Sequence, residues 1–146
     1  MQIIIGSDHG GFEYKNEIIN YLKSRNIEVD DEGTYSAESC DYPVFAQKVA
    51  KKVALANSDD IRGILICGTG IGMSISANKI KGIRAALCSD LFSAKATREH
   101  NNSNVLCLGQ RVLEKDLMLK IVETWLDTPF SNEERHKRRI EMIEKE

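Results

Sequence analysis

The chain has 146 residues, of which 42% are hydrophobic and 29% are charged, as expected for one ordinary globular domain with a sizeable core. Its formal net charge of −2 excludes the global basic field typical of nucleic-acid-binding proteins, and no apolar stretch approaches the roughly 20 residues that span a bilayer. An apolar, strand-like run follows Met1 directly. We therefore expect no signal peptide and a cytoplasmic protein.

Short apolar runs alternate along the chain with longer segments of helical period. The first half predicts, in order, a strand, a helix, a strand and a helix that begins near Pro43: Gln2–Ile5, Phe12–Lys23, Ile27–Val29 and Phe45–Ala54. The second half predicts three strands, each followed by a helix: Gly63–Cys67, Met73–Lys79, Arg84–Cys88, Leu91–His100, Val105–Leu108 and Leu117–Trp125.

This alternation predicts parallel strands joined by right-handed crossovers. The expected fold is a Rossmann-like, three-layer α/β/α sandwich with a five-stranded parallel sheet, forming a single domain over residues 1–146. A further helical segment, Glu133–Glu144, follows Pro129 without a strand of its own. We expect it to form a C-terminal helical arm that reaches over a neighbouring molecule.

The four cysteines do not form the patterns of a metal site or a disulfide framework. None of them belongs to a C-x-x-C pair, and three lie in or beside strand-like runs: Cys67, Cys88 and Cys107. The spacing therefore argues against structural zinc and favours a reducing compartment.

The most informative segment is an apolar run that ends at Cys67 and continues at once into the glycine-alternating loop Gly68–Gly72. Open α/β sheets bind ligands at the carboxyl ends of their strands, and glycines there let backbone N–H groups close around an anion. The loop lacks the Lys-Ser/Thr ending of a P-loop, and Met73 breaks the dinucleotide fingerprint. Cys67 is either a catalytic base or nucleophile, or a strand-ending residue that packs.

Other candidate residues follow strands or occupy the ends of helices. Asp8 and His9 follow the first strand, where Asp8 could also be a helix cap, and Arg111 follows the last strand. His100 lies near the end of a predicted helix, where a histidine often complements the helix dipole. Arg135 and Arg139 are four residues apart and share one helix face, which suits either phosphate binding or a solvated basic surface.

These pieces occur together, and in this order, in a known family. The whole chain closely resembles the type B ribose-5-phosphate isomerases, within the wider group of ribose- and galactose-phosphate isomerases. The resemblance is carried by segments distributed over nearly the full length: Ser7–His9, Asp41–Pro43, Cys67–Gly72, Ala77–Lys79, Gly82–Ala85, Arg98–Asn101, Asn104–Val105, Gly109–Arg111, Arg135–His136 and Arg139.

The resemblance implies an aldose–ketose isomerase of the pentose phosphate pathway that works without a metal or another cofactor. Cys67 matches the base that moves a proton between the first two sugar carbons through a cis-enediolate, and Gly68, Gly70, Ile71 and Gly72 match the loop around that charge. His100 matches the ring-opening acid/base and Thr69 a catalytic partner. Asp8, Tyr42 and Asn101 match substrate-lining positions. His9, Arg111, Arg135 and Arg139 match phosphate-binding positions.

The resemblance also implies a homodimer or homotetramer with sites shared between subunits. One branch of the family replaces the cysteine by a glutamate at the position of Met73, so this chain resembles the cysteine branch. Two alternatives to ribose 5-phosphate isomerisation stay open. One is isomerisation of another sugar phosphate, such as allose 6-phosphate or galactose 6-phosphate, and the other is a non-catalytic phosphate- or nucleotide-binding module.

Overall fold

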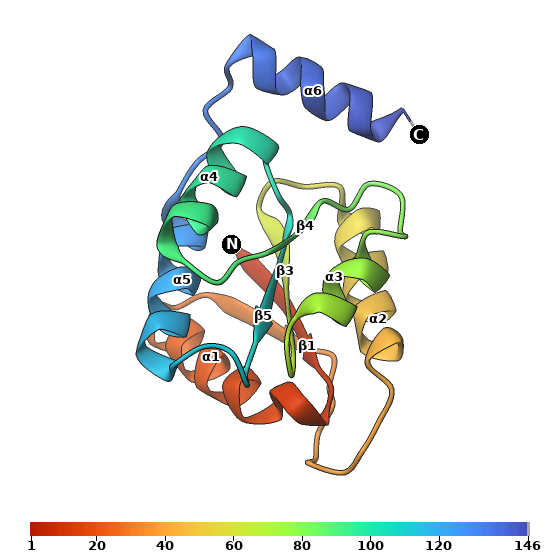
Figure 1. Cartoon of the computed structure of the whole chain (residues 1–146), viewed down its shortest axis with the longest axis vertical. Helices are drawn as coiled ribbons and strands as arrows, with labels where there is room; N and C mark the ends of the chain where they lie inside the picture. The colour runs from red at the N-terminus through yellow and green to blue at the C-terminus, as the bar shows by residue number, and fades with distance from the viewer. Residues whose placement is uncertain (146) are drawn as a thin grey trace.

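Five parallel strands form the centre of the computed structural model, which describes residues 1–145 (Figure 1). The strands lie side by side in the order β2-β1-β3-β5-β4. Their bounds are Gln2–Ser7 for β1, Glu28–Asp31 for β2, Ile61–Cys67 for β3, Ala85–Leu87 for β4 and Val105–Gly109 for β5. The predicted five-stranded parallel sheet is therefore confirmed.

Helices cover both faces of the sheet, which confirms the three-layer arrangement (Figure 1). Helices α1, α4 and α5 pack on one face and bury residues such as Ile18 and Trp125, whereas α2 and α3 pack on the other around Val49 and Met73. The bounds are Phe12–Ser24 for α1, Tyr42–Ala56 for α2, Ile71–Ala77 for α3, Leu91–Asn101 for α4 and Lys115–Asp127 for α5. A short 3-10 turn, His9–Gly11, precedes α1.

The last helix, α6 (Glu134–Glu144), lies apart from the two helical layers, beyond the amino ends of the central strands (Figure 1). It follows α5 without a further strand and packs against the end of α4. Its only buried side chain is that of His136. The predicted C-terminal helical segment is therefore present, and the proposal that it reaches over a neighbouring molecule is taken up below.

Both boundaries of α3 differ from the sequence expectation for identifiable reasons. Helix α3 begins at Ile71 rather than Met73, because Gly70 adopts φ +80° and turns the chain directly into the helix. The same helix ends at Ala77, because the side chain of Asn78 turns away to bind the backbone of Ala85 at the start of β4.

Candidate active site

Cys67 is the last residue of β3, and the glycine loop folds back over its sulfur. The N–H of Gly70 donates a hydrogen bond to Sγ of Cys67 across 3.1 Å, and the Cys67 residue is 5% exposed. Thr69 is exposed, and its Oγ1 accepts a hydrogen bond of 3.3 Å from the N–H of Ile71. The loop therefore places an N–H donor where negative charge on the sulfur needs one.

The absence of a side chain at Gly72 lets the ring of Tyr42 lie against the first turn of α3. A Cβ built at Gly72 would lie 2.5 Å from the nearest ring carbon of Tyr42, which is closer than real Cβ atoms approach. Tyr42 begins α2 and is 40% exposed. The ring predicted to line the substrate site is thus placed beside the Cys67 loop.

Asp8 and His9 lie at the carboxyl end of β1, beside the same loop. Oδ1 of Asp8 accepts a hydrogen bond of 2.9 Å from the N–H of Gly10, so the capping role weighed for this residue is present. Nδ1 of His9 accepts a hydrogen bond of 3.2 Å from the N–H of Cys40. A neutral His9 ring therefore carries its proton on Nε2, which is free to donate to an anion.

The contact with His9 gives Cys40 a role that the sequence does not predict. Cys40 matched no motif and carried no predicted role, yet its backbone N–H fixes the tautomer of His9, 31 residues away in the chain. The role belongs to the backbone, so no side-chain pattern could have revealed it.

Arg111 follows β5 and lies over the start of the glycine loop. A Cβ built at Gly68 would lie 3.1 Å from Nη1 of Arg111, and the N–H of Arg111 donates to the carbonyl oxygen of Gly68 across 2.9 Å. The guanidinium group is exposed. One edge of the sheet thus brings together most of the predicted site residues: Asp8, His9, Tyr42, Cys67, Gly68, Thr69, Gly70, Ile71, Gly72 and Arg111.

The remaining predicted residues lie at the opposite edge of the sheet within this chain. His100 and Asn101 end α4, just before β5 begins at Val105, and Val105 pairs with Gly63 rather than with Cys67. Cys67 lies four positions beyond Gly63 along β3, a distance of about 13 Å. Figure 1 shows the end of α4, together with α6, at the edge away from the carboxyl ends of β1, β3 and β5.

Helix α6 brings its arginines close to His100 at this second edge. The rings of His100 and His136 stack with centroids 4.4 Å apart. Burial, His100 and Arg135 together lower the pKa of His136, while the Glu133 carboxylate opposes them. Arg135 and Arg139 are exposed, and Nη2 of Arg135 lies 3.1 Å from a carboxylate oxygen of Glu133.

The other two buried cysteines, Cys88 and Cys107, lie within the hydrophobic core on opposite faces of the sheet. Burial raises the pKa of Cys88 to about 12, and burial also raises the pKa of Cys107. Both therefore remain neutral thiols, which are poor bases and nucleophiles. Among residues 1–145, no three His, Cys, Asp or Glu side chains gather as a set that could hold a metal ion. No helix in that part of the chain is long and apolar enough to cross a membrane.

Comparison with known proteins places the whole chain in one family. A family model described as Ribose/Galactose Isomerase matches residues 3–143. Ribose-5-phosphate isomerase B of Escherichia coli is 48% identical over 142 residues, covering 97% of this chain and 93% of that protein.

Solved structures agree with the sequence match. The ribose-5-phosphate isomerase B of Clostridium thermocellum superposes with a TM-score of 0.95 at 52% identity, covering 99% of this chain and 96% of that one. The corresponding protein of Thermotoga maritima superposes with a TM-score of 0.94 at 49% identity, covering 99% and 98%. The chain therefore belongs to the ribose/galactose isomerase family.

Proposed function

We propose that this protein is a sugar-phosphate isomerase that interconverts ribose 5-phosphate and ribulose 5-phosphate, with Cys67 as the base. One observation carries the proposal: Sγ of Cys67 lies at the carboxyl end of the central strand β3 with the N–H of Gly70 3.1 Å away. The membership of the ribose/galactose isomerase family and the names of the relatives support the choice of substrate.

In the proposed reaction, Cys67 moves a proton between C1 and C2 of the open-chain sugar. Removing the proton leaves a cis-enediolate, whose negative charge needs fixed hydrogen-bond donors. The N–H groups of the Gly68–Gly72 loop are suited to that charge because they begin α3 and are held in place by the turn at Gly70. Returning the proton to the other carbon completes an isomerisation that calls for no external oxidant.

The other residues have roles in binding the sugar and opening its ring. We assign ring opening to His100 as acid/base with Thr69 as its partner, and contacts to sugar hydroxyl groups to Asp8, Tyr42 and Asn101. The phosphate group would be held by the Nε2–H of His9 and by three guanidinium groups, which bind phosphate through charge-assisted hydrogen bonds: Arg111, Arg135 and Arg139.

The separation of these residues leads us to propose a homodimer whose sites are completed across the interface. Cys67 lies at one edge of the sheet and His100 at the other, so one chain cannot apply both to one sugar. A partner packed in the opposite orientation would bring its His100, Asn101 and α6 arginines to the Cys67 loop. Enclosure by a second chain would also exclude water and strengthen the contacts to the enediolate.

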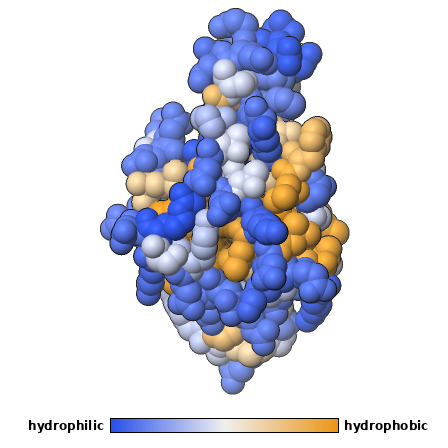
Figure 2. Space-filling model, turned by 90° about the vertical axis from the view of Figure 1, so that its left-hand side faces the viewer, coloured by the Kyte–Doolittle hydropathy of each residue, from blue (hydrophilic) through white to orange (hydrophobic). Residues whose placement is uncertain are grey.

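The exposed hydrophobic residues next to the Cys67 loop support an interface there. Large apolar side chains are exposed on α3, β4 and the start of α4, the most exposed being Phe92 at 82%: Ile71, Ile75, Leu87, Leu91 and Phe92. Figure 2 shows hydrophobic side chains gathered on one flank of the molecule, below the hydrophilic helix α6. Contiguous apolar surface of this kind marks interaction sites.

Turnover of ribose 5-phosphate by the purified protein tests the proposed function. We expect formation of ribulose 5-phosphate, with a rate that thorough chelation leaves unchanged, because every proposed step uses only side chains and backbone N–H groups. Allose 6-phosphate and galactose 6-phosphate serve as competing substrates. Preference for a hexose phosphate would change the substrate, binding without turnover would identify a non-catalytic module, and rescue by a divalent ion after chelation would contradict the mechanism.

Replacing Arg135 by alanine should lower kcat/KM for ribose 5-phosphate. A charge-assisted hydrogen bond contributes about 1.5–3 kcal/mol. This corresponds to roughly one to two decades in efficiency. Inhibition by inorganic phosphate should weaken in parallel. Lys137→Ala is the matched control, because Lys137 is a cation on the same helix but is directed away from Arg135. Unchanged efficiency and unchanged phosphate inhibition in Arg135→Ala would reject the assignment.

A further inference from the structure

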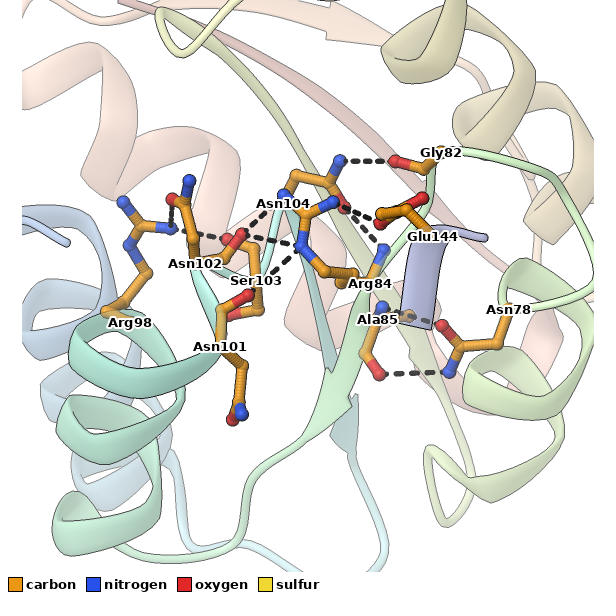
Figure 3. Close-up of polar contacts among 10 residues, drawn as sticks. All are labelled: Asn78, Gly82, Arg84, Ala85, Arg98, Asn101, Asn102, Ser103, Asn104 and Glu144. Carbon is orange, nitrogen blue, oxygen red and sulfur yellow. Dashed lines mark hydrogen bonds and ion pairs between the residues drawn. The ribbon is translucent and has the colours of Figure 1, made fainter. Parts of the chain in front are cut away.

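Three of the family segments are not used by the proposed mechanism, and their polar side chains form one connected network (Figure 3). Asn78 binds the first residue of β4: its Oδ1 accepts from the N–H of Ala85 across 2.8 Å, and its Nδ2 donates to the Ala85 carbonyl oxygen across 3.0 Å. Asn104 accepts from the N–H of Arg84 across 2.8 Å and donates to the carbonyl oxygen of Gly82 across 2.9 Å. The network holds the backbone of Arg84 in place.

The side chain of Arg84 binds the end of α4, which carries His100 and Asn101. Nε donates to the carbonyl oxygens of Asn101 at 3.0 Å and Asn102 at 3.2 Å, and Nη2 donates to that of Asn102 at 2.9 Å. Carbonyl groups at a helix end lack partners within the helix, so a guanidinium group both satisfies them and complements the dipole. Arg84 therefore fixes the last turn of α4.

The same guanidinium group also binds α6. Its Nη1 lies 2.5 Å from Oε1 of Glu144, and the side chain of Arg84 is only 18% exposed. The loop that leads into α6 is attached to α4 separately, because Ser131 donates through its backbone N–H and its hydroxyl group to the carbonyl oxygen of Glu99. Arg84 thus adds an attachment at the C-terminal end of α6, beyond the His100–His136 stack and the Ser131 contacts near its beginning.

We propose that Arg84 is a positioning residue that holds His100, Asn101 and the arginines of α6 as one rigid unit for the partner's Cys67 loop. The inference rests on the proposed function, because it assigns no chemistry to Arg84 itself. Arg84 and Asn101 line a common cavity of about 250 Å³ between β4, α4 and the end of α6. A shift of His100 by about 1 Å can cost on the order of 100-fold in rate.

Arg84 is not the only arginine that holds the end of α4, so stabilising that helix end cannot be its whole role. Arg98 binds the residues that follow α4 from the core side: it donates to Oδ1 of Asn102 at 2.9 Å and to the carbonyl oxygen of Ser103 at 2.6 Å. Arg98 is buried and carries no ion pair to α6 among residues 1–145. Arg84 differs from Arg98 because it also binds α6, and it therefore connects the helix of His100 and Asn101 with the helix of Arg135 and Arg139.

Two variants separate the two contacts of Arg84 and predict different kinetic changes. In Arg84→Lys, an ammonium group can still pair with Glu144 but cannot bind two neighbouring carbonyl groups with a rigid fork, so we expect kcat to fall about tenfold with a smaller change in KM. In Glu144→Ala, the contacts of Arg84 to α4 remain, and α6 loses its ion pair with Arg84. We expect KM for ribose 5-phosphate and the inhibition constant of inorganic phosphate to rise about three- to tenfold together, with kcat nearly unchanged.

Lys81→Met is the matched control, since it removes an exposed cation from the turn just before Arg84 and should change neither constant. Circular dichroism and size-exclusion chromatography establish that each variant is folded and assembled. If both variants keep wild-type kcat and KM, or lose activity only in proportion to their unfolded fraction, the inference is wrong. Should Arg84→Lys fail to fold, the result for Glu144→Ala decides alone. Lack of activity in the unmodified protein would instead overturn the proposed function.

Discussion

Replacing Cys67 by alanine should lower the turnover of ribose 5-phosphate by about 10²–10⁴-fold, the usual contribution of a general base. The substitution removes the one sulfur that accepts a hydrogen bond from the glycine loop and leaves the backbone of β3 unchanged. Because the lost group is a single buried sulfur, we expect the variant to fold and to bind substrate with a similar KM. Steady-state kinetics with ribose 5-phosphate measures the effect.

Cys107→Ala is the control for removing a buried thiol. Cys107 lies on the neighbouring strand β5, paired with Leu65, and is fully buried, so it loses the same atom from the same sheet. Its turnover per folded molecule should stay close to that of the unmodified protein.

Alkylation of Cys67 in the unmodified protein should inactivate it, and substrate should protect against this loss. Near-normal turnover in Cys67→Ala would mean that another residue is the base.

The order of strands and helices could be predicted because the signals are local. Apolar runs such as Gly63–Cys67 are bounded by turn residues, and the apolar stripe of α2 repeats at helical spacing, so neither depends on distant contacts. The limits of α3 could not be read in this way. They depend on the positive φ of Gly70 and on the contact between Asn78 and Ala85, and both are set by how the chain meets β4.

The candidate site was predictable at its centre and less so around it. A cysteine at the end of an apolar strand, followed by glycines, predicts a thiol beside an anion-binding loop, and this prediction needs no tertiary information. The backbone N–H of Cys40 binds His9, 31 positions away, and Arg84 forms an ion pair with Glu144, 60 positions away. Neither contact leaves a spacing pattern in the sequence.

Replacing His100 by alanine should also lower turnover by about 10²–10⁴-fold, because ring opening would lose its proposed acid/base. The proposed site combines Cys67 of one chain with His100 of its partner. A heterodimer of Cys67→Ala and His100→Ala chains therefore contains one site in which both residues are mutated and one in which both are intact. Its activity should exceed the activities of the two parent variants.

The activity of this mixed heterodimer tests the central claim most directly. After dissociation and random reassociation of equal amounts, half of the dimers are mixed and each has one intact site, so about a quarter of the unmodified activity should return. A mixture of Cys67→Ala chains with chains that carry both substitutions is the control, since none of its dimers has an intact site. Mass spectrometry establishes that heterodimers form. Recovery of about a quarter in the first mixture alone is the predicted result, whereas verified heterodimers without recovered activity would contradict a site shared between two chains.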